Sequence, residues 1–333
     1  MLELKTDSYA LETNVHFPTD LNLMWDSLRK VLDTVEKLTC SNGWRKIKLI
    51  RRQAKSIFRA TSQQVFRGGI KDPRKTKQAV KTYLQCARQI YERTREIIPT
   101  KGNDNMMLVL LQELQHYRQY LKLFIDQIER RLIKGEEIPA SEKIFSIFEP
   151  HTEWIKKGKL FPNVELGKLL LITTDQFQFI VDYKVMEHEK DAAQVESLYD
   201  RLKIHFPQTK ITSHSFDKGF YSKGNFNIIE ASGIEQVIMP KRGRKNIDEQ
   251  ERESNPRFKK LRNKHSAVES NINMLEHHGL NRCPDKGLRG LKEYVGLSVL
   301  AYNLHILGNH LIAKERNKQE RLAKQREQYR QAA

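Results

Sequence analysis

The sequence has few of the residues and patterns on which several protein classes depend. Cysteine occurs only three times in 333 residues, as Cys40, Cys86 and Cys283. This odd, scattered set gives no basis for a disulfide framework or a zinc knuckle, and it indicates a reducing compartment. The N-terminus lacks a charged-then-apolar signal pattern, and no apolar run approaches the roughly 20 residues of a membrane-spanning helix. The sequence therefore predicts a cytoplasmic protein without membrane attachment.

Two common enzyme motifs are also missing. The pair Gly68-Gly69 is not followed by the Lys-Ser/Thr of a phosphate-binding loop, so nucleoside triphosphate hydrolysis is unsupported. The Gly-x-Ser-x-Gly elbow of serine hydrolases does not occur either.

Acidic residues are too few to balance the basic ones. The chain has 59 Lys and Arg against 41 Asp and Glu, which gives a formal charge of +18. Such an excess favours a polyanionic partner, because each phosphate neutralised releases condensed counterions; a solvated basic surface is the alternative. The excess is concentrated in residues 41–101, with 17 basic residues against three acids.

Two basic groups are candidate contacts to double-stranded DNA. The first recurs at helical three- and four-residue spacing, so that its members share one helix face: Arg45, Lys48, Arg52, Lys55 and Arg59. The second surrounds Gly243 in an expected loop after Pro240, where a thin segment can enter a minor groove: Lys241, Arg242, Arg244 and Lys245. A solvated helix surface and a flexible basic loop are the respective alternatives.

Hydrophobic periodicity divides the chain into regions of different texture. Residues 1–20 are expected to form a strand and a loop, and 21–137 carry the apolar spacing of about four helices. Residues 138–313 alternate between strand and helix patterns, and 314–333 form a basic helical tail. The expected fold is α/β, a mixed sheet flanked by helices with a large all-helical insertion after the first strand. After Pro150 we expect strands at 164–173, 177–183, 209–216 and 234–239, and helices at 191–204, 221–231, 258–278 and 292–313.

Three acidic residues stand in contexts suited to a metal site. Asp7 ends a short extended start, Asp217 follows an alternating run, and Glu269 lies in a helical segment. The ends of adjacent strands meet at one edge of a sheet, so Asp7 and Asp217 can be neighbours, and a helix packed across that edge can add Glu269. Carboxylate clusters suit Mg²⁺ or Mn²⁺, and two such ions support phosphoryl transfer. Spacing alone is weak evidence, because the chain has 41 acids.

The segments around these acids resemble bacterial insertion-sequence transposases of the DDE type, and the resemblance covers nearly the whole chain. They occur in the family's order: residues 7–20, Phe216-Asp217-Lys218-Gly219-Phe220 and 265–272, supported by 164–168, 279–282 and Asn303-Leu304.

This resemblance implies a ribonuclease H-like catalytic domain in which Asp7, Asp217 and Glu269, matched by position, hold two Mg²⁺ (or Mn²⁺) ions. It implies cleavage of DNA at the terminal inverted repeats of a mobile element and joining of the freed 3′ ends to target DNA. A homodimer is implied because two ends must be handled together. The expected location is the bacterial cytoplasm, at the nucleoid.

Two departures from the family pattern bear on these expectations. Only six residues precede Asp7, where similar transposases carry a DNA-binding region, so a truncated chain is expected. The positions that hold Tyr, Arg and Lys around the glutamate in one branch hold Arg262, His265 and Glu276 here, which indicates another branch. His265 shares a helix face with Glu269 and is a candidate contact to DNA phosphate; a plain helix-surface histidine is the alternative.

Two rival functions remain open from the sequence. One is a truncated, catalytically inactive fragment that binds DNA or inhibits an intact partner. The other is a metal-dependent nuclease of similar fold that cleaves DNA without joining it.

Overall fold

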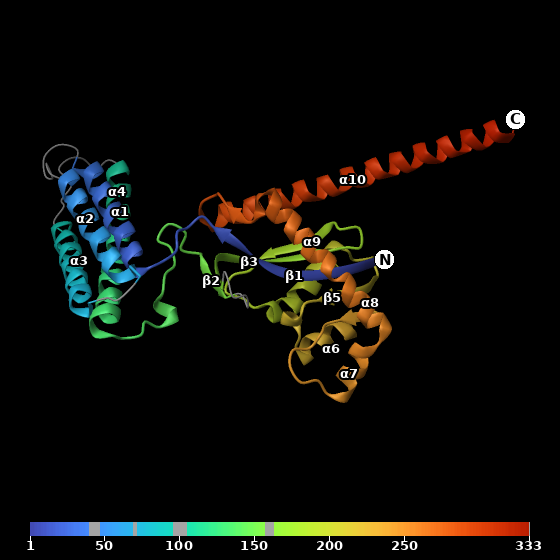
Figure 1. Cartoon of the computed structure of the whole chain (residues 1–333), viewed down its shortest axis with the longest axis horizontal. Coiled ribbons are helices and arrows are strands. Elements are labelled where there is room, and N and C mark those ends of the chain that lie inside the picture. The colour runs from blue at the N-terminus through green and yellow to red at the C-terminus, as the bar shows by residue number, and fades with distance from the viewer. Residues whose placement is uncertain (40–46, 69–71, 96–104, 157–162, 333) are drawn as a thin grey trace. The chain divides into compact units, whose positions relative to one another are not determined.

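The structure is a computed structural model that describes residues 1–39, 47–68, 72–95, 105–156 and 163–332. The chain forms two compact units. The sheet unit comprises Met1–Asn14 and His151–Ala333, and the helical unit comprises Val15–Pro150 (Figure 1). The helical unit therefore interrupts the sheet unit directly after its first strand.

The sheet unit is built on a seven-stranded mixed sheet with β1 near its centre. The strand order is β2-β3-β1-β5-β6, with β4 added beside β3 and β7 beside β1. β1 runs antiparallel to β3 and parallel to β5. The strands are β1 (Leu2–Thr13), β2 (Glu153–Lys156), β3 (Val164–Thr174), β4 (Ile180–Val185), β5 (Ile211–Phe216), β6 (Gln236–Ile238) and β7 (Arg282–Cys283).

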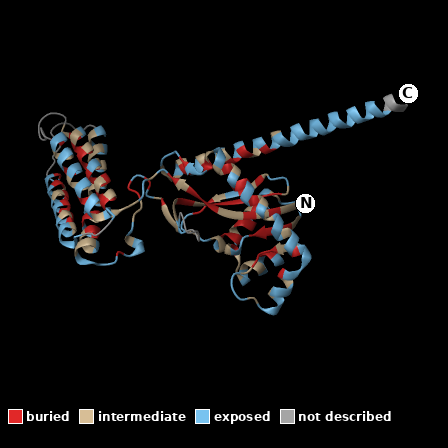
Figure 2. Ribbon diagram, viewed as in Figure 1, coloured by how far each residue is buried: buried red, intermediate tan, exposed pale blue. Residues whose placement is uncertain are grey.

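Helices cover both faces of this sheet. Successive residues of β1 and β3 point to opposite sides, and both sides carry apolar side chains that pack against helices. Tyr9 and Leu170 pack in one core cluster with residues of α9 and α10. Leu4 and Leu171 pack in a second cluster with residues of α5 and α6. Both clusters appear as buried segments in Figure 2. The helical elements are η3 (Asp191–Gln194), α5 (Val195–His205), η4 (Lys218–Phe220), α6 (Lys223–Ala231), α7 (Ile247–Ser254), α8 (Pro256–Lys264), α9 (Ser266–Leu275), η5 (Glu276–Leu280) and α10 (Gly287–Ala332).

A buried polar chain joins the two central strands to a neighbouring strand and helix. The Thr6 hydroxyl lies 2.7 Å from Nε2 of His214 and 2.7 Å from the Thr173 hydroxyl. The Tyr199 hydroxyl lies 2.6 Å from Nδ1 of His214. Burial holds the pKa of His214 well below its usual range, so the ring is neutral, with one nitrogen that donates and one that accepts. These hydrogen bonds fix the register of β1 against β5. Thr6 lies one residue before Asp7, and His214 lies three residues before Asp217.

Gly167 marks the closest approach of two backbones in the sheet. It faces Glu12 across the β1–β3 ladder. A Cβ placed on Gly167 would lie 1.9 Å from the Leu11 carbonyl oxygen, which is far inside van der Waals contact. No residue with a side chain fits this position unless β1 and β3 move apart.

The helical unit has its own hydrophobic core, formed by the apolar stripes of its helices. The Trp25 ring stacks on Phe58 with centroids 5.4 Å apart, which joins α1 to α2. Asp72 caps the N-terminus of α3. Pro73 follows at the first helical position, where its fixed φ angle suits a helix. The described elements are α1 (Asp20–Leu38), α2 (Ile47–Phe66), α3 (Pro73–Arg93), α4 (Asn105–Ile128), η1 (Glu129–Lys134) and η2 (Ala140–Glu142).

From the sequence we expected no apolar stretch near membrane-spanning length, but helix α10 contains one. Among the described helices, it alone contains an 18-residue window long and apolar enough to cross a membrane, by length and composition only, and 22% of that window is buried. Leu291, Val295 and Val299 pack on the sheet. Beyond them the helix continues as a largely exposed rod (Figures 1 and 2).

The predicted mixed α/β sheet flanked by helices is confirmed. Several boundaries differ from the expected ones. β1 runs to Thr13 instead of ending at Asp7, because its second half pairs with β3. The single helix expected at 258–278 is divided near His265, and α7 and β2 were not foreseen.

Candidate active site

Asp7 lies in the middle of β1, where the sheet surrounds it on both sides. It faces Ile172 of β3, and its Oδ1 accepts a hydrogen bond from the Ser8 amide at 2.7 Å. The pKa of Asp7 is raised to about 7, mainly by burial and in smaller part by the negative charges of Asp217, Asp191 and Glu269, against the opposing effect of the Ser8 amide. Asp7 is therefore a partly buried carboxylate that faces other carboxylates.

Asp217 reaches the same place from the neighbouring strand. The β1–β5 ladder ends at the pair Thr6 and Phe216, so Asp7 and Asp217 are the next residues along the two parallel strands. The side chain of Asp217 is 51% exposed, and Oδ2 lies 4.0 Å from Nη2 of Arg242. It precedes η4 but makes no capping hydrogen bond there. Its carboxylate is thus accessible to a ligand, with Arg242 as a neighbour.

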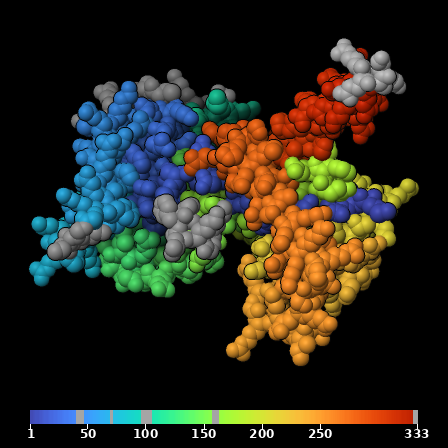
Figure 3. Space-filling model, turned by 45° about the vertical axis from the view of Figure 1, so that its right-hand side comes forward, coloured from blue at the N-terminus to red at the C-terminus, as the bar shows by residue number. Residues whose placement is uncertain are grey.

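Glu269 is supplied by α9, which packs against β1 (Figure 3). Val268 and Ile272 face inward and join the core cluster that contains Tyr9, whereas Glu269 is exposed. Its charge contributes to the raised pKa of Asp7, which places it in the same electrostatic neighbourhood. The structure thus places the three acids that the sequence singles out in one neighbourhood, although their side chains do not form a closed metal site within the described residues.

The donor chemistry of this neighbourhood suits a divalent cation. Several carboxylates act on the partly buried Asp7, and a hard cation with oxygen ligands relieves such repulsion. Within the described residues, however, no three Asp, Glu, His or Cys side chains are already close enough to hold a metal ion. The exposed carboxylates of Asp217 and Glu269 can change rotamer, so they would complete the ligand set only when a cation binds.

His265 occupies a different position from the expected phosphate contact. Its Nδ1 lies 3.0 Å from the Ser215 hydroxyl, beneath the helix instead of on its outer surface. Burial lowers the pKa of His265 to about 4, despite the opposing charge of Asp217. The ring is therefore neutral at physiological pH and offers DNA phosphate no positive charge.

The basic loop after Pro240 is only partly available for DNA. Lys241 bonds both oxygens of Glu249, at 2.9 and 2.7 Å. Lys245 lies 2.5 Å from Glu253. These pairs with α7 neutralise two of the four expected contacts. Arg242 and Arg244 are exposed, and Arg242 lies nearest the acids.

The basic face expected at 45–59 lies on α2 of the helical unit. Arg45 lies outside the described residues. Lys48, Arg52, Lys55 and Arg59 are all exposed, and no described carboxylate pairs with them. Arg51, on another face of the helix, lies 2.7 Å from both Asp33 and Glu36. On α2, Arg51 is therefore neutralised by acids of α1, whereas the exposed stripe of the other four described residues keeps its positive charge.

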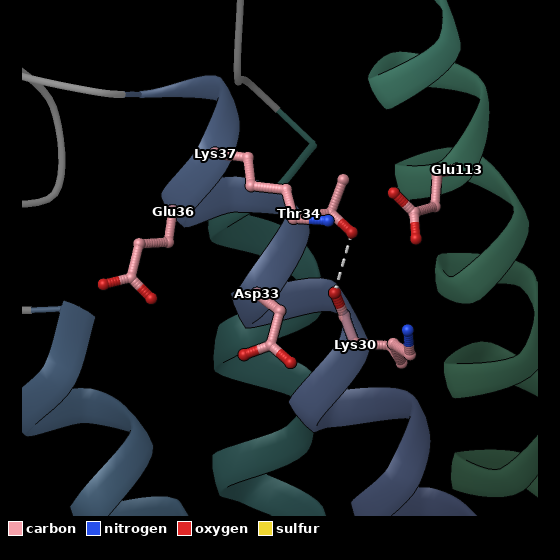
Figure 4. A pocket seen from close by; sticks show the side chains of 6 residues that line it. All are labelled: Lys30, Asp33, Thr34, Glu36, Lys37 and Glu113. Carbon is pink, nitrogen blue, oxygen red and sulfur yellow. Dashed lines mark hydrogen bonds between the residues drawn. The ribbon is translucent and has the colours of Figure 1, made fainter.

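A pocket in the helical unit carries no comparable chemistry. It lies on α1 beside α4, and Figure 4 shows the Thr34 hydroxyl bonded to the Lys30 carbonyl at 2.9 Å. Cations and anions alternate around it, so it has no field of one sign to select a charged ligand. The lining residues are Lys30, Asp33, Thr34, Glu36, Lys37 and Glu113.

Asp191 is an acid that the sequence interpretation missed. Its charge raises the pKa of Asp7, and its contribution exceeds that of Glu269. The local signal was weak, because an aspartate in the first turn of a helix is common for reasons of the helix dipole. What distinguishes it from other first-turn acids is a long-range hydrogen bond, which Oδ1 of Asp191 accepts from the Ser8 hydroxyl of β1 at 2.7 Å.

A mixed sheet with acids from two adjacent strands and a covering helix, in a strongly basic chain, defines a ribonuclease H-like fold of the DDE type. Comparison with protein families agrees: the transposase DDE domain model matches residues 120–304. The chain belongs to this transposase family, whose members act on DNA with divalent metal ions. No curated protein and no solved structure matches it.

Proposed function

We propose that this chain cleaves DNA at the ends of a mobile element and joins the freed 3′ ends to target DNA. The observation that carries the proposal is the strand register: Asp7 and Asp217 follow the last paired residues of two adjacent parallel strands, and α9, which carries Glu269, packs on the first of these strands. In this proposal the three carboxylates hold two Mg²⁺ or Mn²⁺ ions. Such ions, when bound, supply an activated attacking oxygen and stabilise the leaving oxygen of an in-line displacement.

The side chains of the site have separate tasks in this proposal. Asp7 is held within β1, which pairs with β3 on one side and β5 on the other, and it sets the position of the ligand group. Asp217 and Glu269 are exposed and adjust to it. Arg242, with 72% of its side chain exposed beside Asp217, is placed to contact a DNA phosphate. The neutral His265 supports α9 through Ser215.

The test is a cleavage and joining assay on a duplex that contains an element end. The full chain is expected to give a nicked or cut product and a joined product with Mg²⁺ or Mn²⁺, and neither with EDTA. Salt-sensitive binding without cleavage would support a non-catalytic DNA-binding fragment instead. Cleavage without a joined product would support a nuclease, because hydrolysis and joining differ only in the attacking oxygen.

We further propose that the exposed stripe of α2 binds the DNA backbone. Replacing Arg52, Lys55 and Arg59 together by glutamine is expected to reduce the slope of log K against log salt by roughly 2 to 3, since each lost phosphate contact contributes about 0.9. The side chains are exposed and unpaired, so the fold should be unaffected. Binding to a fixed duplex at several salt concentrations measures the slope.

A matched control removes the same charge from the exposed tail of α10, through Lys314→Gln, Lys318→Gln and Arg321→Gln. If both triple variants lowered the slope equally, the slope would depend only on the net charge of the chain. The proposed contact between α2 and the DNA backbone would then be wrong.

We propose that two copies of the chain pair through α10. Five exposed leucines recur there at alternating three- and four-residue spacing, the period of a helix seam that pairs with a like seam. The residues that continue this seam beyond 313 are Lys314, Lys318 and Arg321, so antiparallel pairing, which keeps the basic tails apart, is favoured. The exposed fractions are 67% for Leu297, 56% for Leu300, 58% for Leu304, 45% for Leu307 and 58% for Leu311.

Replacing Leu300 and Leu304 by glutamate is expected to shift a dimer to monomer, because each charge would be buried in the seam. Sedimentation equilibrium at micromolar concentration measures this, with Leu322→Glu, also exposed but outside the seam, as control. A monomeric wild type at these concentrations would contradict the dimer. Binding of the wild type to lipid vesicles would contradict it as well.

A further inference from the structure

We propose that Glu253, together with Glu249, is a positioning residue that holds the basic loop of residues 241–245 so that Arg242 stands beside Asp217 and contacts a DNA phosphate there. This role rests on the proposed function of the site and adds the residues that orient its arginine. Three features of the loop support it: the alternation of its side chains, the carboxylates that tie its ends to α7, and the place where Arg242 lies.

The side chains of the basic loop alternate between α7 and solvent. Lys241 and Lys245, at the two ends, are partly buried and paired with acids of α7. Arg242, Gly243 and Arg244, between them, are exposed. Gly243 has a φ of +78°, in the left-handed region that favours glycine. The loop is therefore a turn that presents two arginines and is fixed at both ends.

A single buried carboxylate ties these two ends together. Oε1 of Glu253 accepts a hydrogen bond from the Lys241 amide at 3.0 Å, and Oε2 lies 2.5 Å from Nζ of Lys245. Because Glu253 is only 6% exposed, water competes weakly for these bonds, and each is stronger than it would be at the surface. Glu253 therefore sets the distance between the ends of the loop.

Glu249 adds a second tie one helical turn earlier in α7. Its two oxygens lie 2.9 and 2.7 Å from Nζ of Lys241, and Oε1 also accepts a hydrogen bond from the Tyr221 hydroxyl at 2.7 Å. Hydrogen bonds from Lys241, Tyr221 and the Asn246 amide lower the pKa of Glu249 to about 2, so it stays charged at neutral pH. Asn246 and Glu249 also form the capping box of α7, which fixes the start of the helix to the end of the loop.

The tied loop places Arg242 over the turn that follows Asp217. Nη2 of Arg242 lies 4.0 Å from Oδ2 of Asp217. The same atom lies 3.7 Å from the point that a Cβ on Gly219, in η4, would occupy. Arginine donates to phosphate through a planar fork. A fork that is held near its place loses less conformational freedom on binding than one on a mobile loop.

The negative charge of Glu253 gives the test a definite sign. An acid in a DNA-binding protein repels phosphate, so its neutralisation ordinarily strengthens binding. If Glu253 positions Arg242, Glu253→Gln should instead weaken binding, although the chain becomes more positive. Glutamine has nearly the same shape, but it lacks the charge that holds the Lys245 ammonium, so one end of the loop is released.

The experiment measures binding of the full chain, in EDTA, to the duplex of the cleavage assay by fluorescence anisotropy. Arg242→Gln should weaken binding by up to about 10-fold near 0.1 M salt, because one phosphate contact is lost. Glu253→Gln should weaken it by roughly 3- to 10-fold, because the same contact is misplaced. The control is Glu251→Gln, which removes the same charge from an exposed position of α7 and should leave binding unchanged or slightly stronger.

A double-variant cycle separates positioning from a merely structural role. If Glu253 acts through Arg242, the chain with both substitutions should bind no more weakly than Arg242→Gln alone. Additive losses, an unchanged affinity of Arg242→Gln, or a Glu253→Gln chain that binds like Glu251→Gln would each overturn the inference. If circular dichroism showed that Glu253→Gln does not fold, Glu249→Gln would take its place in the cycle, since Glu249 is the more exposed of the two acids.

The outcomes distinguish this role from the proposed function, because binding in EDTA needs neither a metal ion nor cleavage. If the wild type cleaved and joined DNA while Glu253→Gln bound like Glu251→Gln, only the role of Glu253 would be wrong. If Glu253→Gln weakened binding through Arg242 while the wild type gave no product with Mg²⁺ or Mn²⁺, cleavage and joining would be wrong and the DNA contact would stand.

Discussion

Replacing Asp217 by asparagine is expected to lower DNA cleavage and joining by about three orders of magnitude or more, the scale on which a catalytic unit loses function when one member is removed. Asparagine has nearly the same shape but lacks the negative charge that a divalent ion requires. Glu269→Gln should have a comparable effect for the same reason. Both variants are measured in the cleavage and joining assay with Mg²⁺.

The structure predicts that these losses occur without unfolding. Asp217 is half exposed and makes no capping hydrogen bond, and Glu269 lies on the exposed face of α9. The free energy of unfolding should therefore change by no more than about 0.5 kcal/mol. DNA binding at low salt should also persist, since the basic stripe of α2 is untouched. Asp200→Asn serves as control, and full activity of Asp217→Asn would contradict the assigned site.

Replacing Lys168 by methionine is expected to destabilise the sheet unit by about 3–5 kcal/mol. Lys168 lies in β3 with only 2% of its side chain exposed, and Nζ forms a short ion pair with Oε1 of Glu153 in β2. Methionine fills the same volume but leaves the Glu153 carboxylate, 14% exposed, without its cation. The remaining hydrogen bond from the His188 amide, at 2.9 Å, does not neutralise that charge.

The second variant in this series removes both charges. Lys168→Met with Glu153→Met should recover a large part of the loss, because a buried pair replaced by apolar groups costs little. Lys156→Met, at the exposed end of β2, is the control. Urea unfolding followed by the fluorescence of Trp154, with Trp25 and Trp44 replaced by phenylalanine, reports on β2 and β3 alone. A double variant no better than Lys168→Met would show that the lost stability comes from packing, not from the unpaired charge.

Parts of the fold follow from local pattern, and these were predicted well. The continuous apolar run of β3 and the alternation of β5 specify strands whatever they pair with, because side-chain direction alternates along a strand. The apolar residues of α1 and α3 recur at three- and four-residue spacing, which puts them on one face of a helix and so specifies helices. Predictions were wrong where the decisive contact is distant. The second half of β1 is a strand because β3 pairs with it from about 160 residues away.

The availability of the basic residues could not be predicted either. In the sequence Lys241 and Lys245 look equivalent to Arg242 and Arg244, but α7 folds back and places Glu249 and Glu253 against the two lysines. His265 was a candidate contact to DNA phosphate, yet its ring nitrogen Nδ1 lies 3.0 Å from the Ser215 hydroxyl where the expected single helix is divided. In each case a neighbour supplied by another element decides the charge that remains for DNA.

The sequence by itself determined the helix and strand patterns, the basic charge that suits DNA, and the match of residues 120–304 to the transposase family. These properties depend on residues close together in the chain or on simple counts. Only the tertiary structure decided which acids act on Asp7, which cations are free, and why residue 167 must be glycine. These depend on through-space distances between segments as far apart as Ser8 and Asp191. Electrostatic and steric energies follow those distances, and sequence separation does not encode them.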